Sequence, residues 1–423
     1  MKKRISFIVL SAMLASMMLA GCSTSEDVDH TYTGKKLYEL VKINLNETEK
    51  KYVERNNDFA FKLFKNVSEM ENKEPGFLVS PLSVTYVLGM INNGAAGTTR
   101  EEINSVLGFG NGDAEAVNNF CRKLLTGSPN VDKSVKINIA NLVEVRKDCK
   151  LKPAFKQTVE EAYDARVESA DFDDPGTVTH INDWCAKQTN GMIPQVLDRV
   201  SPETVALLLN AIYFKGVWYS QFKPRNTRNE VFTMAGGKQS EVPMMHQRDI
   251  FLYNTNETYA TLSMSYGNGG YRMLVLLPND GKTTDDVLEA INSDKWISNL
   301  NGLRNYQVDV KLPRFETSTK TNLNEVLKAL GAGSMFDGYK ADFSNFCELS
   351  AHVSKIFQCA KIKVNEEGSE AAAVTVGGME TTAPGMGEIP TAVFHANRPF
   401  IYAITENTTG SIYFIGVYGG DGK

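Results

Sequence analysis

Apolar residues recur at helical spacing in the N-terminal part of the chain. Residues 57–64 predict a helix that starts behind an Asn57 or Asp58 cap. Pro81 suits the first turn of a second, apolar-rich helix, which is expected to stop at Asn93-Gly94. The run from Thr98 to Glu102 indicates the capped start of a third helix.

Strand-like runs of aliphatic residues dominate the later part of the chain, at 205–209, 273–277, 308–312 and 412–417. Helices come early and strands late, and no Pro- or Ser-rich linker occurs after about residue 50. The pattern therefore predicts an α+β fold in a single domain that covers residues 51–423.

The N-terminus resembles a bacterial lipoprotein signal. Basic residues 2–4 precede the apolar run 5–19, which is short for a membrane span, and Leu-Ala-Gly-Cys follows at 19–22. The resemblance implies that residues 1–21 are a signal peptide and that the Cys22 thiol carries lipid, with 22–50 as a tether. The protein would then be anchored to the bacterial outer membrane, on its periplasmic or cell-surface face. The alternative is a plain secretory signal with an unrelated Cys22.

Composition and motifs narrow the function by exclusion. The chain is 42% hydrophobic and 22% charged, with a net charge of -5 and no basic cluster, so nucleic acid is not an expected partner. The sequence has no GxSxG, HExxH or Walker motif, and its five histidines do not share metal-ligand spacing. We therefore expect no enzyme activity, no cofactor and no metal. The cysteines at 121, 149, 185, 347 and 359 are expected to be free thiols.

Five separated segments resemble the serpin family and occur in serpin order. They are 80–83 with 94–99, 181–184 with 189–193, 210–218, 310–315, and 397–400 with 412–416. The resemblance implies a large, mostly antiparallel five-stranded sheet A, two smaller sheets, about nine helices and an exposed reactive loop at 366–390. It implies a monomeric suicide substrate that traps serine proteases, and some cysteine proteases, when the cleaved loop enters sheet A. The alternatives are a non-inhibitory serpin that acts as a surface binding or structural lipoprotein, and a surface hydrolase.

The loop must be able to become a central strand, so its inward side chains must be small or apolar. One alternating face of the hinge carries Ser369, Ala371, Ala373 and Thr375, and the other begins with Glu370 and Ala372. Gly368, after Glu366, gives a flexible pivot. The hinge segment meets this requirement. Judged without the other family-like segments, it could also be a flexible linker or a short helix.

The reactive bond is expected between Thr382 and Ala383, fourteen positions after Gly368 by the family's usual count. An inserted strand of that length spans about 45 Å. Counting back from Pro399 gives a later bond near 385–388, but that cut would force Pro384 into the strand. Alternatives to Thr382 are Met379, Thr381 and Met386. No Lys or Arg lies between Lys363 and Arg398, which favours elastase-like or subtilisin-like targets over trypsin-like ones.

The resemblance also implies a polar cluster beneath the opening strands of sheet A, at Ser80, Ser83 and Asn210. Gln358 stands where the family usually has a histidine. We therefore do not expect this chain to show the pH-dependent behaviour that is attributed to that histidine in relatives, because a glutamine side chain cannot become charged. Trp218 matches an aromatic residue at the top of the sheet. Ordinary capping, buried hydrogen bonding and core packing are the alternative roles of these residues.

Overall fold

The computed structural model describes residues 39–71, 76–110, 113–201, 203–369 and 389–420. The predicted signal peptide and Cys22 lie outside these residues. Among the helices in the described part of the chain, none combines the length and the apolar character needed to cross a membrane.

Within these residues there are nine α-helices, which confirms the expected number. They are α1 (Glu47–Met70), α2 (Pro81–Gly94), α3 (Gly97–Val106), α4 (Ala114–Val131), α5 (Pro153–Tyr163), α6 (Pro175–Gln188), α7 (Thr284–Ala290), α8 (Ser293–Gly302) and α9 (Asn324–Ala329). α2 begins as predicted, with Pro81 in its first turn and Ser80 as its cap.

Two predicted helix starts are wrong. α1 begins ten residues before Asn57, because Asn46 and Glu49 form a reciprocal capping box there. Asn57 lies inside the helix, and its side chain instead donates to the carbonyl of Gly410 and accepts from the amide of Ile412. α3 begins at Gly97 behind Ala96, without a side-chain cap. The capping box and first turn of α1 fall within residues 22–50, the range predicted as a tether.

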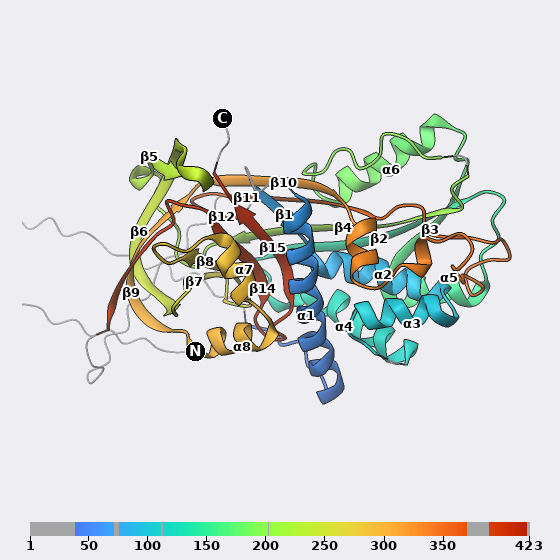
Figure 1. Cartoon of the computed structure of the whole chain (residues 1–423), viewed down its shortest axis with the longest axis horizontal. Helices are drawn as coiled ribbons and strands as arrows, with labels where there is room; N and C mark the ends of the chain where they lie inside the picture. Colours follow the sequence, from blue (N-terminus) through green and yellow to red (C-terminus); the bar gives the residue numbers. More distant parts are fainter. Residues whose placement is uncertain (1–38, 72–75, 111–112, 202, 370–388, 421–423) are drawn as a thin grey trace, which may run out of the picture. The chain divides into compact units, whose positions relative to one another are not determined.

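Six strands form the main sheet, which corresponds to the expected sheet A (Figure 1). Their order is β10 (Phe315–Asn322), β11 (Phe357–Val364), β12 (Gly368–Ser369), β4 (Ala206–Val217), β2 (Lys136–Arg146) and β3 (Ala165–Ala170). Among the strand pairs that the described residues form in this sheet, only β2–β3 is parallel. Five of these strands match the predicted five-stranded sheet, and the two-residue β12 is an addition between β11 and β4.

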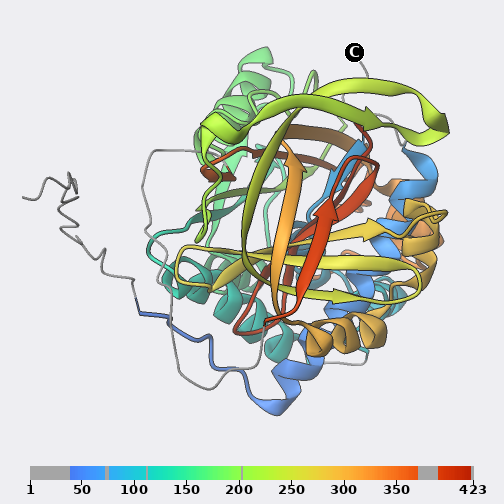
Figure 2. The same cartoon turned by 90° about the vertical axis from the view of Figure 1, so that its left-hand side faces the viewer.

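The remaining strands form one nine-stranded sheet, where two smaller sheets were expected. The hydrogen-bonded order is β1 (Gly76–Val79), β15 (Ile412–Tyr418), β14 (Phe400–Glu406), β8 (Tyr271–Pro278), β7 (Tyr259–Tyr266), β6 (Gln239–Thr255), β9 (Arg304–Pro313) and β13 (Thr391–His395), with β5 (Arg228–Thr233) beside β6. The seventeen residues of β6 pair with β5, β9 and β7 in turn, which joins the two expected sheets. Figure 2 shows β13 (red) running parallel to β9 (orange).

Two hydrophobic cores lie on the two faces of the main sheet. The larger core contains residues of α1, α2 and β15 together with Ile212 and Phe214 of β4. The smaller core lies under α6 and joins Ile181 and Trp184 of that helix to Leu142 of β2. α6 therefore covers one face of the main sheet and α2 lies on the other (Figure 1). β12 enters the sheet between β11 and β4.

Candidate functional site

The candidate site is a partly filled slot between β11 and β4. Gly368 and Ser369 form β12 at one end of this slot: Gly368 faces Val217, and Ser369 lies between Gly216 and Val364. Gly368 has a φ of +154°, and a Cβ placed on it would lie 2.0 Å from the carbonyl oxygen of Gly216. No side chain fits there, so glycine is required for the hinge to approach β4.

Aromatic side chains hold β12 in place. Ser369 is only 1% exposed and its hydroxyl lies 2.6 Å from the hydroxyl of Tyr266. Tyr266 stacks on Trp218, with ring centroids 4.4 Å apart. The Trp218 indole donates to the carbonyl of Asn365 at 3.0 Å, and its backbone amide donates to Glu367 at 2.8 Å. Burial raises the pKa of Tyr266 far above its usual range, so its hydroxyl remains protonated.

Glu366 anchors the segment that precedes β12. Its carboxylate accepts from the Arg314 guanidinium at 2.5 and 3.2 Å and from the Thr227 hydroxyl at 2.7 Å. Burial opposes ionisation of Glu366, but the hydrogen bonds from Arg314 and Thr227 outweigh it and lower the pKa of the carboxyl group. The start of the loop is thus fixed by a charge-assisted bidentate pair.

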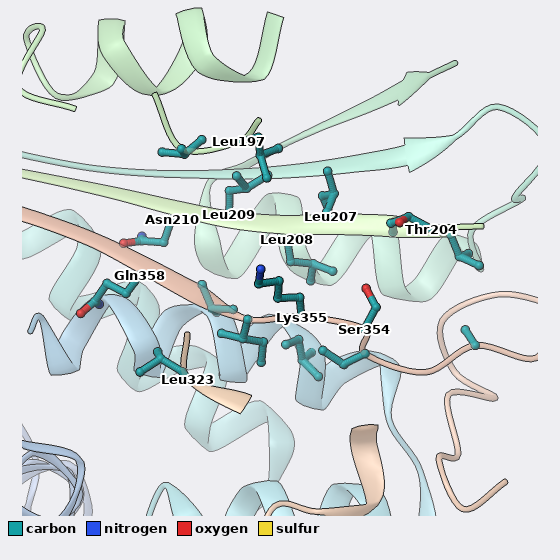
Figure 3. Close-up of a pocket in the computed structure, with 18 of the residues that line it drawn as sticks. Leu197, Thr204, Leu207, Leu208, Leu209, Asn210, Leu323, Ser354, Lys355 and Gln358 are labelled. Carbon is teal, nitrogen blue, oxygen red and sulfur yellow. The ribbon is translucent and has the colours of Figure 1, made fainter. Parts of the chain in front are cut away.

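Below β12, no described residue pairs with the exposed edge of β4. β4 pairs with β2 along Ala206–Lys215, but within the described residues its other edge pairs only with β12, at Gly216 and Val217. A cavity of about 270 Å³ opens there, between β4 and the segment that leads into β11 (Figure 3). Residues 206–210 of β4 are only half-buried although the strand lies in the middle of the sheet. The unpaired edge of β4 can therefore accept another strand.

Side chains of β4 line the cavity on alternating sides. Leu207 and Leu209 point toward Leu197, on the side of α6, whereas Leu208 and Asn210 point to the opposite side (Figure 3). This alternation is the ordinary consequence of strand geometry. The slot consequently offers apolar surface on both faces and a polar position at Asn210.

The predicted polar cluster forms two groups, which are linked where the Ser83 amide donates to the Ser80 hydroxyl. Gln358 of β11 accepts from the amide of Ser80 and donates to its carbonyl, both at 2.8 Å. Across the slot, Asn210 of β4 accepts a hydrogen bond from Ser83 and donates to Asn141 at 2.9 Å. A glutamine amide can both donate and accept, which explains how Gln358 satisfies both backbone groups of Ser80. Each strand beside the slot thus holds its own half of the cluster.

Sequence reasoning missed three residues of the site: Arg314, Thr227 and Tyr266. They lie far from the hinge in the chain and meet it only through the fold. Arg314 stands within one of the five resemblance segments, which is the one signal that pointed to it.

Much of the predicted loop lies outside the described residues. This applies to the hinge positions Glu370, Ala371, Ala372, Ala373 and Thr375, to the proposed bond Thr382–Ala383 and to its alternatives Met379, Thr381 and Met386. The structure thus places only the first part of the hinge, Glu366 to Ser369.

The comparisons with known proteins agree with this architecture. The family model described as serpin (serine protease inhibitor) matches residues 54–419. Glia-derived nexin of Rattus norvegicus is 32% identical over 376 residues, which are 86% of this chain and 92% of that protein. The native structure of the thermophilic serpin Tengpin has a TM-score of 0.79 and 28% identity, with 91% of this chain and 97% of that one covered. Human thyroxine-binding globulin complexed with its ligand has a TM-score of 0.78 at 27% identity, with 88% and 98% covered. The chain therefore belongs to the serpin family.

Proposed function

We propose that this chain is an inhibitory serpin that traps serine proteases by inserting its cleaved reactive loop between β11 and β4. One observation carries the proposal: β12 fills one end of a slot between β11 and β4, and no other strand of the described residues occupies the rest of it. The bidentate bond between Arg314 and Glu366 fixes the end of the loop that would have to stay in place. The vacant part of β4 offers the hydrogen-bonding edge that a new strand requires.

The register of β12 supports the proposal. Ser369 faces Gly216 on one side and Val364 on the other. An antiparallel strand advances by one residue while its neighbour goes back by one, so Thr375 would face Asn210 and Gln358. The Thr375 hydroxyl would then meet the two halves of the polar cluster, and could bond to either amide.

The alternation of the loop also fits the two faces of the sheet. The buried Ser369 points toward Tyr266, so Ala371 would point inward as well, beside Phe214 and Ile362. Glu370 would point outward between Lys215 and Lys363, where its charge is favourable.

The length of β4 supports Thr382–Ala383 as the reactive bond. In the same register Met379 would face Ala206, the first residue of β4. A fully inserted strand would therefore end near Met379, three residues before Thr382, and Pro384 would remain outside the ladder.

The chemistry requires nothing from the serpin except a well-placed bond. The protease serine attacks the carbonyl of Thr382, the new amino group of Ala383 leaves with a proton, and an ester joins the two proteins. Insertion at about 3.3 Å per residue would then carry the attached protease along the sheet before water can hydrolyse the ester.

The proposed targets are elastase-like or subtilisin-like serine proteases, with some cysteine proteases as a further class. A loop without Lys or Arg between Lys363 and Arg398 offers nothing to a pocket that binds basic side chains. We also propose that the protein acts as a monomer attached to the bacterial outer membrane through lipid on Cys22. A non-inhibitory surface serpin remains the second candidate, because the same fold carries the thyroxine complex of thyroxine-binding globulin.

Incubation with elastase tests the function. We expect a complex with the summed mass of the two chains that survives denaturing gel electrophoresis, and a released peptide that begins at Ala383 in mass spectrometry. Trypsin, as the matched control, should form no complex through this loop. If elastase yields only cleaved chain, the inhibitory function is excluded and the non-inhibitory candidate is favoured.

A further inference from the structure

A cluster of three potential metal ligands lies at the far side of the main sheet from β12. Glu144 of β2 and Glu168 of β3 face each other directly in the parallel β2–β3 register. His180 of α6 lies over them, and one ligand atom from each of the three residues falls within 4.8 Å of the others. The cluster thus joins two strands to the helix that covers them.

Glu144 has one carboxylate oxygen without a hydrogen-bond partner among the described residues. It is only 2% exposed, and its Oε2 atom makes no hydrogen bond. It shares a strand face with Leu142, whose side chain belongs to the small core beneath α6. Burial and the nearby Glu168 raise the pKa of Glu144. A buried carboxylate without a partner is costly, and such groups are normally paired or coordinate a metal.

The other two residues are arranged to share a ligand. His180 Nε2 lies 2.8 Å from Glu168 Oε2, while the second oxygen of Glu168 pairs with Arg166. The side chains of His180 and Arg166 are 47% and 59% exposed, so an ion has access from solvent. Arg166 balances only one of the two carboxylates, which leaves the cluster with a net negative charge when Glu144 is ionised.

We propose that Glu144, Glu168 and His180 form a binding site for a divalent transition metal such as Zn²⁺, which ties α6 to β2 and β3. Two carboxylate oxygens and one imidazole nitrogen are common zinc ligands, and three protein ligands leave a fourth position for water. The ion would take the place of the His180–Glu168 hydrogen bond and would give the orphaned oxygen of Glu144 a partner. The expectation of no metal site came from spacing along the sequence, whereas these ligands come from three separate elements.

Zinc titration of the full-length, chelator-stripped protein tests the site. Isothermal titration calorimetry with Zn²⁺ alone should detect one ion per chain that is lost in His180→Gln and Glu144→Gln. Loss of an outer-shell partner weakens metal binding by about 10–100-fold, and loss of a direct ligand should weaken zinc binding by at least that factor. Zinc should also raise the melting temperature of the parent but not of His180→Gln. His352→Gln, which replaces an exposed histidine on a different segment, should bind zinc like the parent.

Two controls make the result decisive. Melting of the metal-free variants shows whether they fold, and Glu144→Gln should remain folded because it removes a buried charge. Substitution of Co²⁺ for Zn²⁺ reports the ligand type, since cysteine ligation would give an intense thiolate charge-transfer band that carboxylate and imidazole ligands lack. The proposal is overturned if the parent binds no zinc, if both variants bind it as tightly as the parent, or if the thiolate band appears.

Discussion

Ala371→Arg is expected to convert the protein from an inhibitor of elastase into a substrate. In the register set by Ser369, residue 371 would lie beside Phe214 and Ile362, which are 6% and 5% exposed. Burying an arginine there costs several kcal/mol, so the cleaved loop should insert too slowly to trap the protease. The measurement is the number of inhibitor molecules consumed per protease inactivated, which should rise at least ~10-fold while the fold stays intact.

Ala372→Arg is the matched control. Residue 372 would point to the outer face between the buried Tyr213 and Lys361, whose side chain is 27% exposed, so the arginine can extend along Lys361 to solvent. This variant should inhibit far better than Ala371→Arg. Equal inhibition by the two variants would contradict the proposed register, and full inhibition by Ala371→Arg would contradict insertion itself.

Trp218→Ala should cause the second large effect, a loss of about 3–5 kcal/mol in the free energy of unfolding. Trp218 is fully buried, stacks on Tyr266 and donates to Asn365, so its removal leaves a cavity and an unpaired carbonyl beside the hinge. Denaturant titration of the intact protein measures the loss.

Trp218→Phe separates the two contributions. It keeps an aromatic ring against Tyr266 but removes the indole N–H and part of the bicyclic ring, so it should cost about 1–3 kcal/mol, less than Trp218→Ala. A loss below about 1 kcal/mol for Trp218→Ala would show that the aromatic stack does not hold the hinge region.

Much of the fold could be predicted from local pattern. The start of α2 followed from Pro81, and the apolar runs at 273–277 and 412–417 became β8 and β15. The starts of α1 and α3 were mistaken because Asn57 and Thr98 are types that cap helices, although the Asn46–Glu49 capping box was a local signal for the true start of α1.

The candidate site was predictable in part. The resemblance pointed to Trp218 and Gln358, but it could not tell that Gln358 would bond both backbone groups of Ser80. The two smaller sheets are joined because β6 pairs with β5, β9 and β7 along its length. No local sequence signal specifies where this pairing ends. The cluster of Glu144, Glu168 and His180 depends on the β2–β3 register and on the placement of α6, which are both tertiary.

The melting temperatures of the intact protein and of the elastase-cleaved protein test the central claim most directly. If the severed loop enters the slot between β11 and β4, cleaved protein gains a central strand. For a domain of about 370 residues, a gain of about 5 kcal/mol would raise its melting temperature by roughly 6 °C. Cleaved Ala371→Arg should lack this increase. Equal melting temperatures for the intact and cleaved parent would contradict the account.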